Sequence, residues 1–365
     1  MLDAFLRLLS GERPNQIVWM ADLAYWIAGQ QQAGTAKSQW NTEEGFLQLH
    51  KELGILPYYY YEPGKSWAAE PRYDRCVEVV DAKDRDKSVR RFRTPVGEIW
   101  EESVYSPLSC SVGVTKHFVR SERDLDVLLY ILRHRRLEPT SLVGWPERRR
   151  LWESYDGLPC IGLVRSPLAA FLVEWAGMQA GSYLLIDCPE KFAEFAQLME
   201  EQEMPMIDAV CELAPPLVHF CDNLTSECTT NLYDAYMAPA HRRRLERLHA
   251  AGVKCAVHLD GTVKGLLPKL VRSGFDAIEA LTPKPGGDLD VQQIRDLAQS
   301  NTVILWGGVP GIMFAPPYTW DQMEAHVQRL IECWQGRPFI MGVADQIPPD
   351  GDIEFCRRIA QLISA

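Results

Sequence analysis

The C-terminal half of the chain alternates short apolar runs with amphipathic helical patterns. Five runs have the length and composition of buried strands, at residues 217–221, 254–258, 277–281, 302–306 and 338–342. Helical patterns follow them, at residues 233–251, 263–272, 291–299, 320–333 and 353–363. Because successive β-then-α units join parallel strands through right-handed crossovers, this order predicts a parallel sheet covered by helices.

The N-terminal half supplies enough further strands to close such a sheet. Strand candidates lie at residues 17–20, 55–60 and 160–164, and residues 1–9 form an amphipathic helical pattern. Eight parallel strands favour a closed (β/α)₈ TIM barrel over an open, doubly wound sheet. We therefore expect residues 1–365 to form a single barrel domain, since α/β barrels often exceed the usual domain length.

Residues 75–118 break this rhythm. Residues 76–80, 89–93 and 98–105 alternate like antiparallel strands, and a charged turn and a Thr-Pro-Val-Gly turn separate them. The pattern predicts a β-hairpin insertion within the barrel domain. Such an insertion could cap the mouth of the active site or form a purely structural flap.

Charge and cysteine content narrow the classes of partner. The chain has 38 Lys and Arg against 49 Asp and Glu, a net charge of −11, which argues against nucleic acid or an anionic membrane surface. No apolar run approaches the roughly 18 residues of a membrane span. Ten scattered cysteines without a CxxC pair are typical of a reducing compartment. We expect a cytoplasmic monomer or homodimer that acts on a small molecule.

Polar residues follow the ends of several predicted strands, where (β/α)₈ barrels place their chemistry. His258 and Asp260 are two residues apart, so both can project into one cavity. Asp222 and Glu279 lie near the ends of the neighbouring strands. Such a set could bind a divalent ion through N and O ligands or act as a metal-free histidine acid/base. The alternatives are a structural histidine and, for Asp222, a turn or helix cap.

Several motifs together resemble members of the uroporphyrinogen decarboxylase family, in its methyltransferase-like branch. They are Ser10-Gly11-Glu12-Arg13-Pro14, Thr94-Pro95-Val96-Gly97-Glu98, Asp222-Asn223, His258-Leu259-Asp260-Gly261 and Gly342-Val343-Ala344-Asp345-Gln346. The resemblance spans nearly the whole chain. It implies a (β/α)₈ barrel with its site in the top cleft. The family includes the porphyrinogen decarboxylase and zinc methyltransferases that move methyl groups between corrinoids and thiols.

Departures from the decarboxylase pattern argue against that activity. The arginine-bearing segment after the first strand is replaced by residues 20–26 without arginine, and the late Gly-His-Gly motif becomes Ala344-Asp345-Gln346. Like charges about 4 Å apart repel by roughly 4 kcal/mol at an effective dielectric near 20. We therefore expect the cavity to reject the polyanion uroporphyrinogen, because five acids are predicted at its edge: Asp22, Asp222, Asp260, Glu279 and Asp345.

The zinc methyltransferases of the family carry a His-x-Cys pair and a later cysteine. This chain has His258-x-Asp260, Asp345 at the later position, and Glu279 as a fourth ligand. The resemblance thus implies a metal set of these four residues, with zinc or another hard divalent ion. Carboxylates in place of thiolates make the site harder and more negative. The methyl acceptor then need not be a thiol.

The leading hypothesis is a methyltransferase-like enzyme that exchanges a methyl group with a small molecule or with a corrinoid carried by a partner protein. His258, Asp260 and Asp222 are its predicted catalytic residues. The predicted substrate-binding residues are Asp22, Tyr25, Trp26, Asn223 and Trp306. Two alternatives remain: a cofactor-free decarboxylase or lyase acting on a smaller, less acidic substrate, and a non-catalytic protein that binds a corrinoid or another small molecule.

Overall fold

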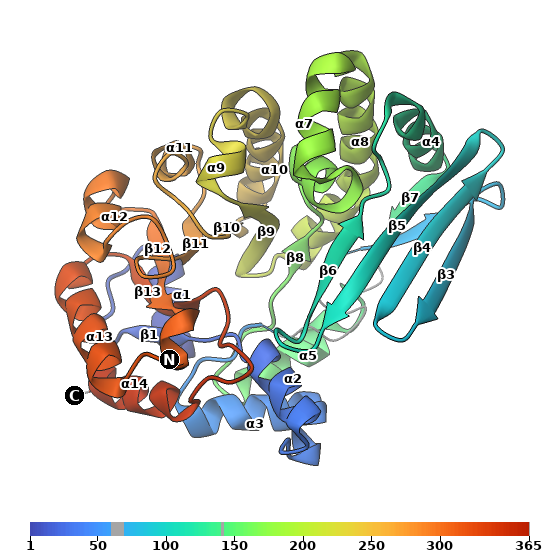
Figure 1. Cartoon of the computed structure of the whole chain (residues 1–365). Helices are drawn as coiled ribbons and strands as arrows, with labels where there is room; N and C mark the ends of the chain where they lie inside the picture. The colour runs from blue at the N-terminus through green and yellow to red at the C-terminus, as the bar shows by residue number, and fades with distance from the viewer. Residues whose placement is uncertain (60–68, 140–141, 365) are drawn as a thin grey trace.

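The computed structural model describes residues 1–59, 69–139 and 142–364 (Figure 1). Its main sheet is parallel, with the strand order β1-β13-β12-β11-β10-β9-β8. The strands are β1 (Val18–Met20), β8 (Gly162–Leu163), β9 (Leu217–Leu224), β10 (Lys254–Leu259), β11 (Ala277–Leu281), β12 (Ile304–Pro310) and β13 (Phe339–Ala344). The pairing of β1 with β13 brings the last strand of the chain back to the first.

An extended segment, residues 55–59, fills the gap between β1 and β8. The Leu56 amide donates to the Trp19 carbonyl of β1 at 2.9 Å. On the other side, the Cys160 amide donates to the Tyr58 carbonyl at 3.2 Å, just before β8. The segment takes the eighth strand position and closes the barrel, which confirms the predicted (β/α)₈ fold. Tyr60, the last residue of the predicted strand, lies outside the described residues.

Helix α1 (Leu2–Leu9) packs against the interior of the barrel at the starts of the strands. Alternate strand residues face the barrel axis, and those near the strand starts form one apolar cluster with α1: Val18, Leu56, Leu217, Ala256, Ala277, Ile304 and Ile340. The Phe5 ring lies edge-on to Tyr58 and Trp306, with centroid distances of 6.1 and 6.0 Å. This packing fills the lower barrel and leaves the polar residues to its C-terminal end.

The other helices surround the sheet (Figure 1). In α13, Met323, Val327 and Leu330 recur at helical spacing and are buried, each burial contributing about 1.5–3 kcal/mol. The α-helices are α2 (Ala24–Ala33), α3 (Glu43–Leu53), α4 (Glu122–Arg133), α5 (Trp145–Glu153), α6 (Pro167–Ala170), α7 (Gly177–Asp187), α8 (Pro189–Leu213), α9 (Ser226–Thr229), α10 (Ala238–Ala250), α11 (Leu267–Val271), α12 (Val291–Ala298), α13 (Trp320–Trp334) and α14 (Glu354–Ser364). Short 3₁₀ or π turns are η1 (Ser38–Asn41), η3 (Phe171–Trp175), η4 (Tyr233–Met237) and η5 (Gly311–Phe314). No helix in the described ranges is long and apolar enough to cross a membrane.

A four-stranded antiparallel sheet lies beside the barrel (Figure 1). The predicted strands of the 75–118 segment are present as β3 (Glu78–Asp84), β4 (Lys87–Thr94) and β5 (Gly97–Ser106). A fourth strand, β6 (Ser111–Lys116), was not predicted; its Val112 and Val114 are exposed, so it has no buried face to reveal it. Phe92 of β4 packs against Phe118 and Trp175, with centroids 5.3 and 6.0 Å away. A second antiparallel pair joins β2 (Glu70–Tyr73) to β7 (Arg135–Glu138).

Four strands run further than their apolar runs predict. Strand β9 continues past residue 221 to Leu224, β12 past residue 306 to Pro310 and β13 past residue 342 to Ala344, and β10 ends one residue later than predicted, at Leu259. Helix α11 is shorter than predicted and begins only at Leu267. The extension of β9 matters for the site, because it makes Asp222 and Asn223 strand residues that point to opposite faces of the sheet.

Candidate functional site

A cavity of about 440 Å³ lies at the C-terminal ends of the barrel strands. This is the end at which the sequence predicts the chemistry. Strands β10 and β11 contribute His258 and Glu279, and Asp260 and Asp345 directly follow β10 and β13. Other polar lining residues are Tyr25, Tyr59, Arg165, His219, Asn223 and Gln346.

His258 and Glu279 form the central pair of the cavity. They are opposite each other in the register of β10 and β11, and His258 Nδ1 donates to Glu279 Oε2 at 2.5 Å. The second carboxylate oxygen, Oε1, accepts from the Tyr59 hydroxyl at 2.7 Å. Burial alone would lower the pKa of His258, but the charge and hydrogen bond of Glu279, with the charges of Asp345 and Asp260, outweigh burial and raise that pKa to about 9. At neutral pH the pair is an imidazolium and a carboxylate.

Asp345 faces the other nitrogen of the same imidazole. Its Oδ1 lies 4.0 Å from His258 Nε2. Burial raises the pKa of Asp345 to about 6; repulsion by Glu279 and Asp260 acts in the same direction, and attraction by His258 opposes it. A proton donor and a proton acceptor with pKa values on either side of neutrality therefore lie side by side.

His219 of β9 forms the floor of the cavity. Its Nδ1 is 2.9 Å from the Tyr58 hydroxyl and 3.6 Å from Cys160 Sγ. Burial lowers the pKa of His219 to about 4, so this imidazole is neutral. Its Nε2 lies 3.9 Å from Glu279 Oε2 and forms no hydrogen bond with any residue in the described ranges. Burial also raises the pKa of the Cys160 thiol to about 12, so it is not a thiolate nucleophile.

Arg165 and Asn223 form one wall. Arg165, which follows β8, donates to Glu174 Oε1 at 2.8 Å and to Asn223 Oδ1 at 2.9 Å. Asn223 has a φ of 51°, a left-handed conformation that asparagine tolerates better than most residues. It lies where the pairing of β9 with β10 shifts register, and such bulges often re-aim side chains beside active sites.

Asp222 does not lie in the cavity, which corrects its predicted catalytic position. Since His219, Cys221 and Asn223 line the cavity, alternation along β9 turns Asp222 to the outer face. There its Oδ2 is 2.7 Å from His241 Nε2, and its Oδ1 accepts from the Ser166 amide at 2.7 Å. The alternative reading of Asp222, as a residue that bonds a turn, fits this arrangement.

Three predicted substrate-binding residues support the cavity from behind, whereas Tyr25 and Asn223 line it. Asp22 is buried and accepts from the Ala24 amide at 2.8 Å at the start of α2. The buried Trp26 indole donates to the Gly351 carbonyl at 3.1 Å. Trp306 is buried below the floor, with its ring centroid 5.3 Å from that of His219. The acids of the lining are thus Asp260, Glu279 and Asp345, and not the five that were predicted.

The predicted metal set does not fit an ion in this arrangement. His258 Nδ1 is bound to Glu279, and both Glu279 oxygens already accept hydrogen bonds. The remaining donors are His258 Nε2 and Asp345 Oδ1, which lie 4.0 Å apart, and the carboxylate of Asp260. The described part of the chain holds one group of three His, Cys, Asp or Glu donors that lie within 4.8 Å of one another. That group lies outside the cavity. These donors of the cavity are therefore arranged for hydrogen bonds and proton transfer, and the metal set of His258, Asp260, Glu279 and Asp345 stays a prediction.

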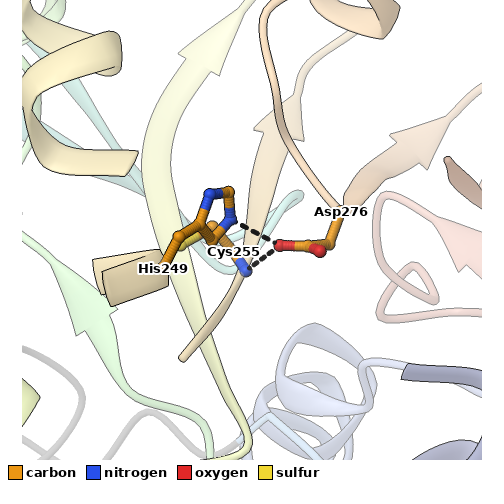
Figure 2. A group of neighbouring side chains, drawn as sticks. All are labelled: His249, Cys255 and Asp276. Atoms are coloured by element: carbon orange, nitrogen blue, oxygen red, sulfur yellow. Dashed lines mark hydrogen bonds and ion pairs between the residues drawn. The ribbon is translucent and has the colours of Figure 1, made fainter. Parts of the chain in front are cut away.

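That other group, His249, Cys255 and Asp276, lies at the starts of β10 and β11 (Figure 2). Asp276 Oδ2 is 2.9 Å from both His249 Nε2 and the Cys255 amide, and Oδ1 accepts from Lys254 Nζ at 3.0 Å. Burial raises the pKa of the Cys255 thiol, which opposes the thiolate that a metal would need. These bonds join the two strands at the end of the barrel where residues serve stability.

Eight lining residues were not among the predicted site residues: Ala24, Tyr59, Cys160, Gly162, Arg165, His219, Cys221 and Gln346. His219 could have been found from strand alternation. It lies four positions before the predicted residue Asn223 in the same strand, and residues an even number of positions apart face the same side of a strand. For Tyr59 and Cys160 the signal was weaker, because their segments form few regular strand residues. Arg165 directly follows a predicted strand.

Comparison with solved structures shows the same fold in distant proteins. A methyltransferase from Methanosarcina mazei superposes with a TM-score of 0.63 at 11% identity, covering 99% of this chain and 98% of that one. A B12-independent methionine synthase from Shewanella sp. W3-18-1, in complex with selenomethionine, gives a TM-score of 0.52 at 10% identity over 96% of both chains. No curated protein sequence matches the chain.

The sequence also matches a family model. The uroporphyrinogen decarboxylase (URO-D) model covers residues 148–365, which include β8 to β13 and most of the cavity lining. The match spans more than half of the chain and agrees with the resemblance of its motifs. This protein belongs to the uroporphyrinogen decarboxylase (URO-D) family.

Proposed function

We propose that this chain is a methyltransferase-like enzyme whose reaction takes place in the cavity at the C-terminal end of the barrel. The observation that carries the proposal is the position of His258 between two carboxylates, with Glu279 at Nδ1 and Asp345 facing Nε2. Membership of the URO-D family supports it, as does the barrel shared with a protein named as a methyltransferase.

The arrangement can move the protons that methyl transfer requires. In the step X–CH₃ + H–Nu → X–H + CH₃–Nu, the X–CH₃ bond breaks and the CH₃–Nu bond forms. The Asp345 carboxylate accepts the proton of the acceptor, and His258 gives its Nε2 proton to the departing atom X. Because Glu279 holds Nδ1, the proton available to the substrate is the one on Nε2. Afterwards a proton returns from Asp345 to His258. A positioned acid or base typically contributes about 10²–10⁴ in rate.

The walls of the cavity can orient the substrate. Asn223 is held by Arg165, and Arg165 is itself held by Glu174, so the amide group keeps a fixed position. Tyr25 and Asp260 line the cavity on α2 and after β10. Fixed groups of this kind reduce the entropy that reacting partners lose when they meet.

A corrinoid carried by a partner protein is our proposal for the second methyl carrier; because a corrinoid carries no transferable proton, only the proton of the small-molecule partner is then moved by His258 or Asp345. The barrel fold does not by itself require one, because the Shewanella protein with this fold is named B12-independent. Methylcobalamin and small methyl donors should therefore be compared in the same assay.

Mass spectrometry of methylated products tests the proposal. His258→Ala and Asp260→Ala should each abolish turnover while the circular dichroism and melting temperature stay unchanged. Asp296→Ala, in an exposed position on α12, is the matched control and should keep full turnover. Wild-type rates in both cavity variants would rule the proposal out.

A carboxy-lyase is the second candidate, favoured by the Arg165 guanidinium in the cavity lining. Arg165 could bind a substrate carboxylate, and the Nε2 proton of His258 could protonate the carbanion left by loss of CO₂. Release of CO₂ from a small carboxylic acid, with loss of that release in His258→Ala and no methyl transfer from any donor, would favour this function.

A further inference from the structure

The rim of the cavity combines an aromatic ring with two carboxylates. Tyr25 is in the first turn of α2 and lines the cavity together with Asp260 and Asp345. Burial raises the pKa of Tyr25, and the charges of Asp345, Asp22 and Asp260 raise it further. We call these three residues the rim.

The charge of the lining is negative. The imidazolium of His258 is shared between Glu279 at 2.5 Å and Asp345 at 4.0 Å, so it compensates only one of them. Arg165 is paired with Glu174 at 2.8 Å. Asp260 makes no ion pair with the residues that the structure describes. Uncompensated negative charge therefore lies at the rim and favours a cation there.

The floor of the same cavity offers a hydrogen-bonding atom without a partner. His219 lines the cavity and is 3% exposed, and its Nε2, which lies 3.9 Å from Glu279 Oε2, has no hydrogen bond to any described residue. When the Tyr58 hydroxyl donates to Nδ1, Nε2 carries the hydrogen and can donate to a ligand oxygen. A buried polar atom left unpaired is costly, so this position favours a ligand that pairs it.

We infer that the rim binds the cationic head of a methylated onium compound, such as a quaternary amine, while His219 donates to an oxygen at its other end, and that this compound is the methyl donor. An aromatic face together with carboxylates suits an organic cation, which needs no shell of oxygen ligands. The inference rests on the proposed methyl transfer and names the class of its donor.

The chemistry of an onium donor balances with the residues present. In R₃N⁺–CH₃ + H–Nu → R₃NH⁺ + CH₃–Nu, the N–CH₃ bond breaks and its electron pair stays on nitrogen. The CH₃–Nu bond forms, Asp345 accepts the proton of the acceptor, and His258 gives its Nε2 proton to the electron pair of the departing amine. A proton then returns from Asp345 to His258, and the rim releases the ammonium product.

Calorimetric binding of three probes tests the inference without any turnover. Choline and tetramethylammonium are cations, and 3,3-dimethylbutan-1-ol is the uncharged carbon isostere of choline. We expect choline to bind about tenfold or more tightly than its isostere, with an affinity that falls as salt rises. Equal affinities of choline and its isostere, or no binding of either cation, would overturn the inference.

Variants assign the binding to the rim. Asp260→Asn, Asp345→Asn and Tyr25→Leu should each lower the affinity for choline and for tetramethylammonium by about threefold to tenfold. Tyr25→Phe keeps the aromatic ring and should keep the affinity. The exposed Asp296→Asn is the matched control and should bind like the wild type. Unchanged affinity in all three rim variants would place the cation elsewhere and contradict the inference.

His219→Phe separates the floor from the rim. This substitution should lower the affinity for choline, which has an oxygen, and leave the affinity for tetramethylammonium, which has none, unchanged. Equal affinities of wild type and variant for choline would remove His219 from the ligand site. Methyl transfer from an uncharged donor, without cation binding, would refute the onium donor and leave the proposed function standing. Cation binding without methyl transfer from any donor would refute the proposed function instead.

Discussion

His258 and Glu279 lie opposite each other on the neighbouring strands β10 and β11, with 2.5 Å between Nδ1 and Oε2. The pair fixes which imidazole nitrogen faces the substrate. Asp345 then lies 4.0 Å from that nitrogen, Nε2. Glu279, His258 and Asp345 therefore form a row of carboxylate, imidazole and carboxylate in the cavity. The proposed proton transfers depend on Glu279 holding Nδ1 and on Asp345 facing Nε2.

The rate of methyl transfer should have a bell-shaped dependence on pH. Asp345, with a pKa of about 6, must be deprotonated to accept a proton, so the rate rises as pH passes through about 6. His258, with a pKa of about 9, must be protonated to donate one, so the rate falls as pH passes through about 9. Steady-state rates from pH 5 to 10 measure both limbs. A rate independent of pH over this range would contradict the acid/base roles.

The metal content should not depend on the cavity residues. Because the four predicted ligands do not converge in this arrangement, we expect equal zinc per chain in wild type, His258→Ala and Asp345→Asn, by mass spectrometry of protein prepared without chelators. One ion per wild-type chain that both variants lose would restore the metal set and displace the metal-free mechanism.

The buried pair of Asp222 and His241 should stabilise the fold. Replacing Asp222 by asparagine should lower the free energy of unfolding by about 3–5 kcal/mol, the usual cost of breaking a buried pair. Asp208→Asn is the matched control. Its partner Arg247 is on α10, as His241 is, but Asp208 and Arg247 are both exposed. Asp208→Asn should therefore change the free energy of unfolding by less than about 1 kcal/mol. Urea unfolding compares the two. A smaller loss for Asp222→Asn than for Asp208→Asn would refute the structural role.

The same pair predicts how stability depends on acid. Burial alone would raise the pKa of Asp222, but its bonds to His241 and Ser166 and the charge of Arg244 lower it to about 2, from an ordinary 3.8. A depressed pKa contributes stability above the unfolded pKa and loses it as pH falls toward the folded one. We expect about 2 kcal/mol to be lost between pH 4 and 2 in the wild type and not in Asp222→Asn. Equal losses in both proteins would assign acid unfolding to other groups.

Helix α1 should contribute to the stability of the barrel through Phe5. Its ring is fully buried against Tyr58 and Trp306, so Phe5→Ala should cost about 3–5 kcal/mol. The exposed Leu108 provides the control, and Leu108→Ala should be neutral. Thermal unfolding of the two variants gives the comparison, and equal melting temperatures would show that α1 does not support the barrel.

Sequence patterns predicted the barrel because its strands are apolar and buried. Strand β11 has the same bounds as its predicted apolar run, residues 277–281. Strand β6 was missed because its valines are exposed, and the pair of β2 and β7 because each is four residues long with few buried positions. Regular elements without a buried face leave little periodic signal.

The lining of the cavity was predicted in part, and two physical causes explain the differences. His258, Asp260, Glu279 and Asp345 all line the cavity, as predicted, because each lies in or just after the C-terminal part of a barrel strand. Asp222 was misplaced because β9 extends past its apolar run, which turns that residue to the outer face. Contacts between distant segments, such as the Tyr59 hydroxyl on Glu279, leave no periodic trace in a single sequence.

The charge state of His258 is the central claim, and an NMR titration of its ring measures it directly. Comparison with His258→Gln assigns the signal among the eight histidines. The row of carboxylates predicts a midpoint near pH 9 in the wild type, falling by about one unit or more in Glu279→Gln. A wild-type midpoint at or below the ordinary 6.5 would contradict it, because His258 would then be neutral at physiological pH and unable to act as the proton donor.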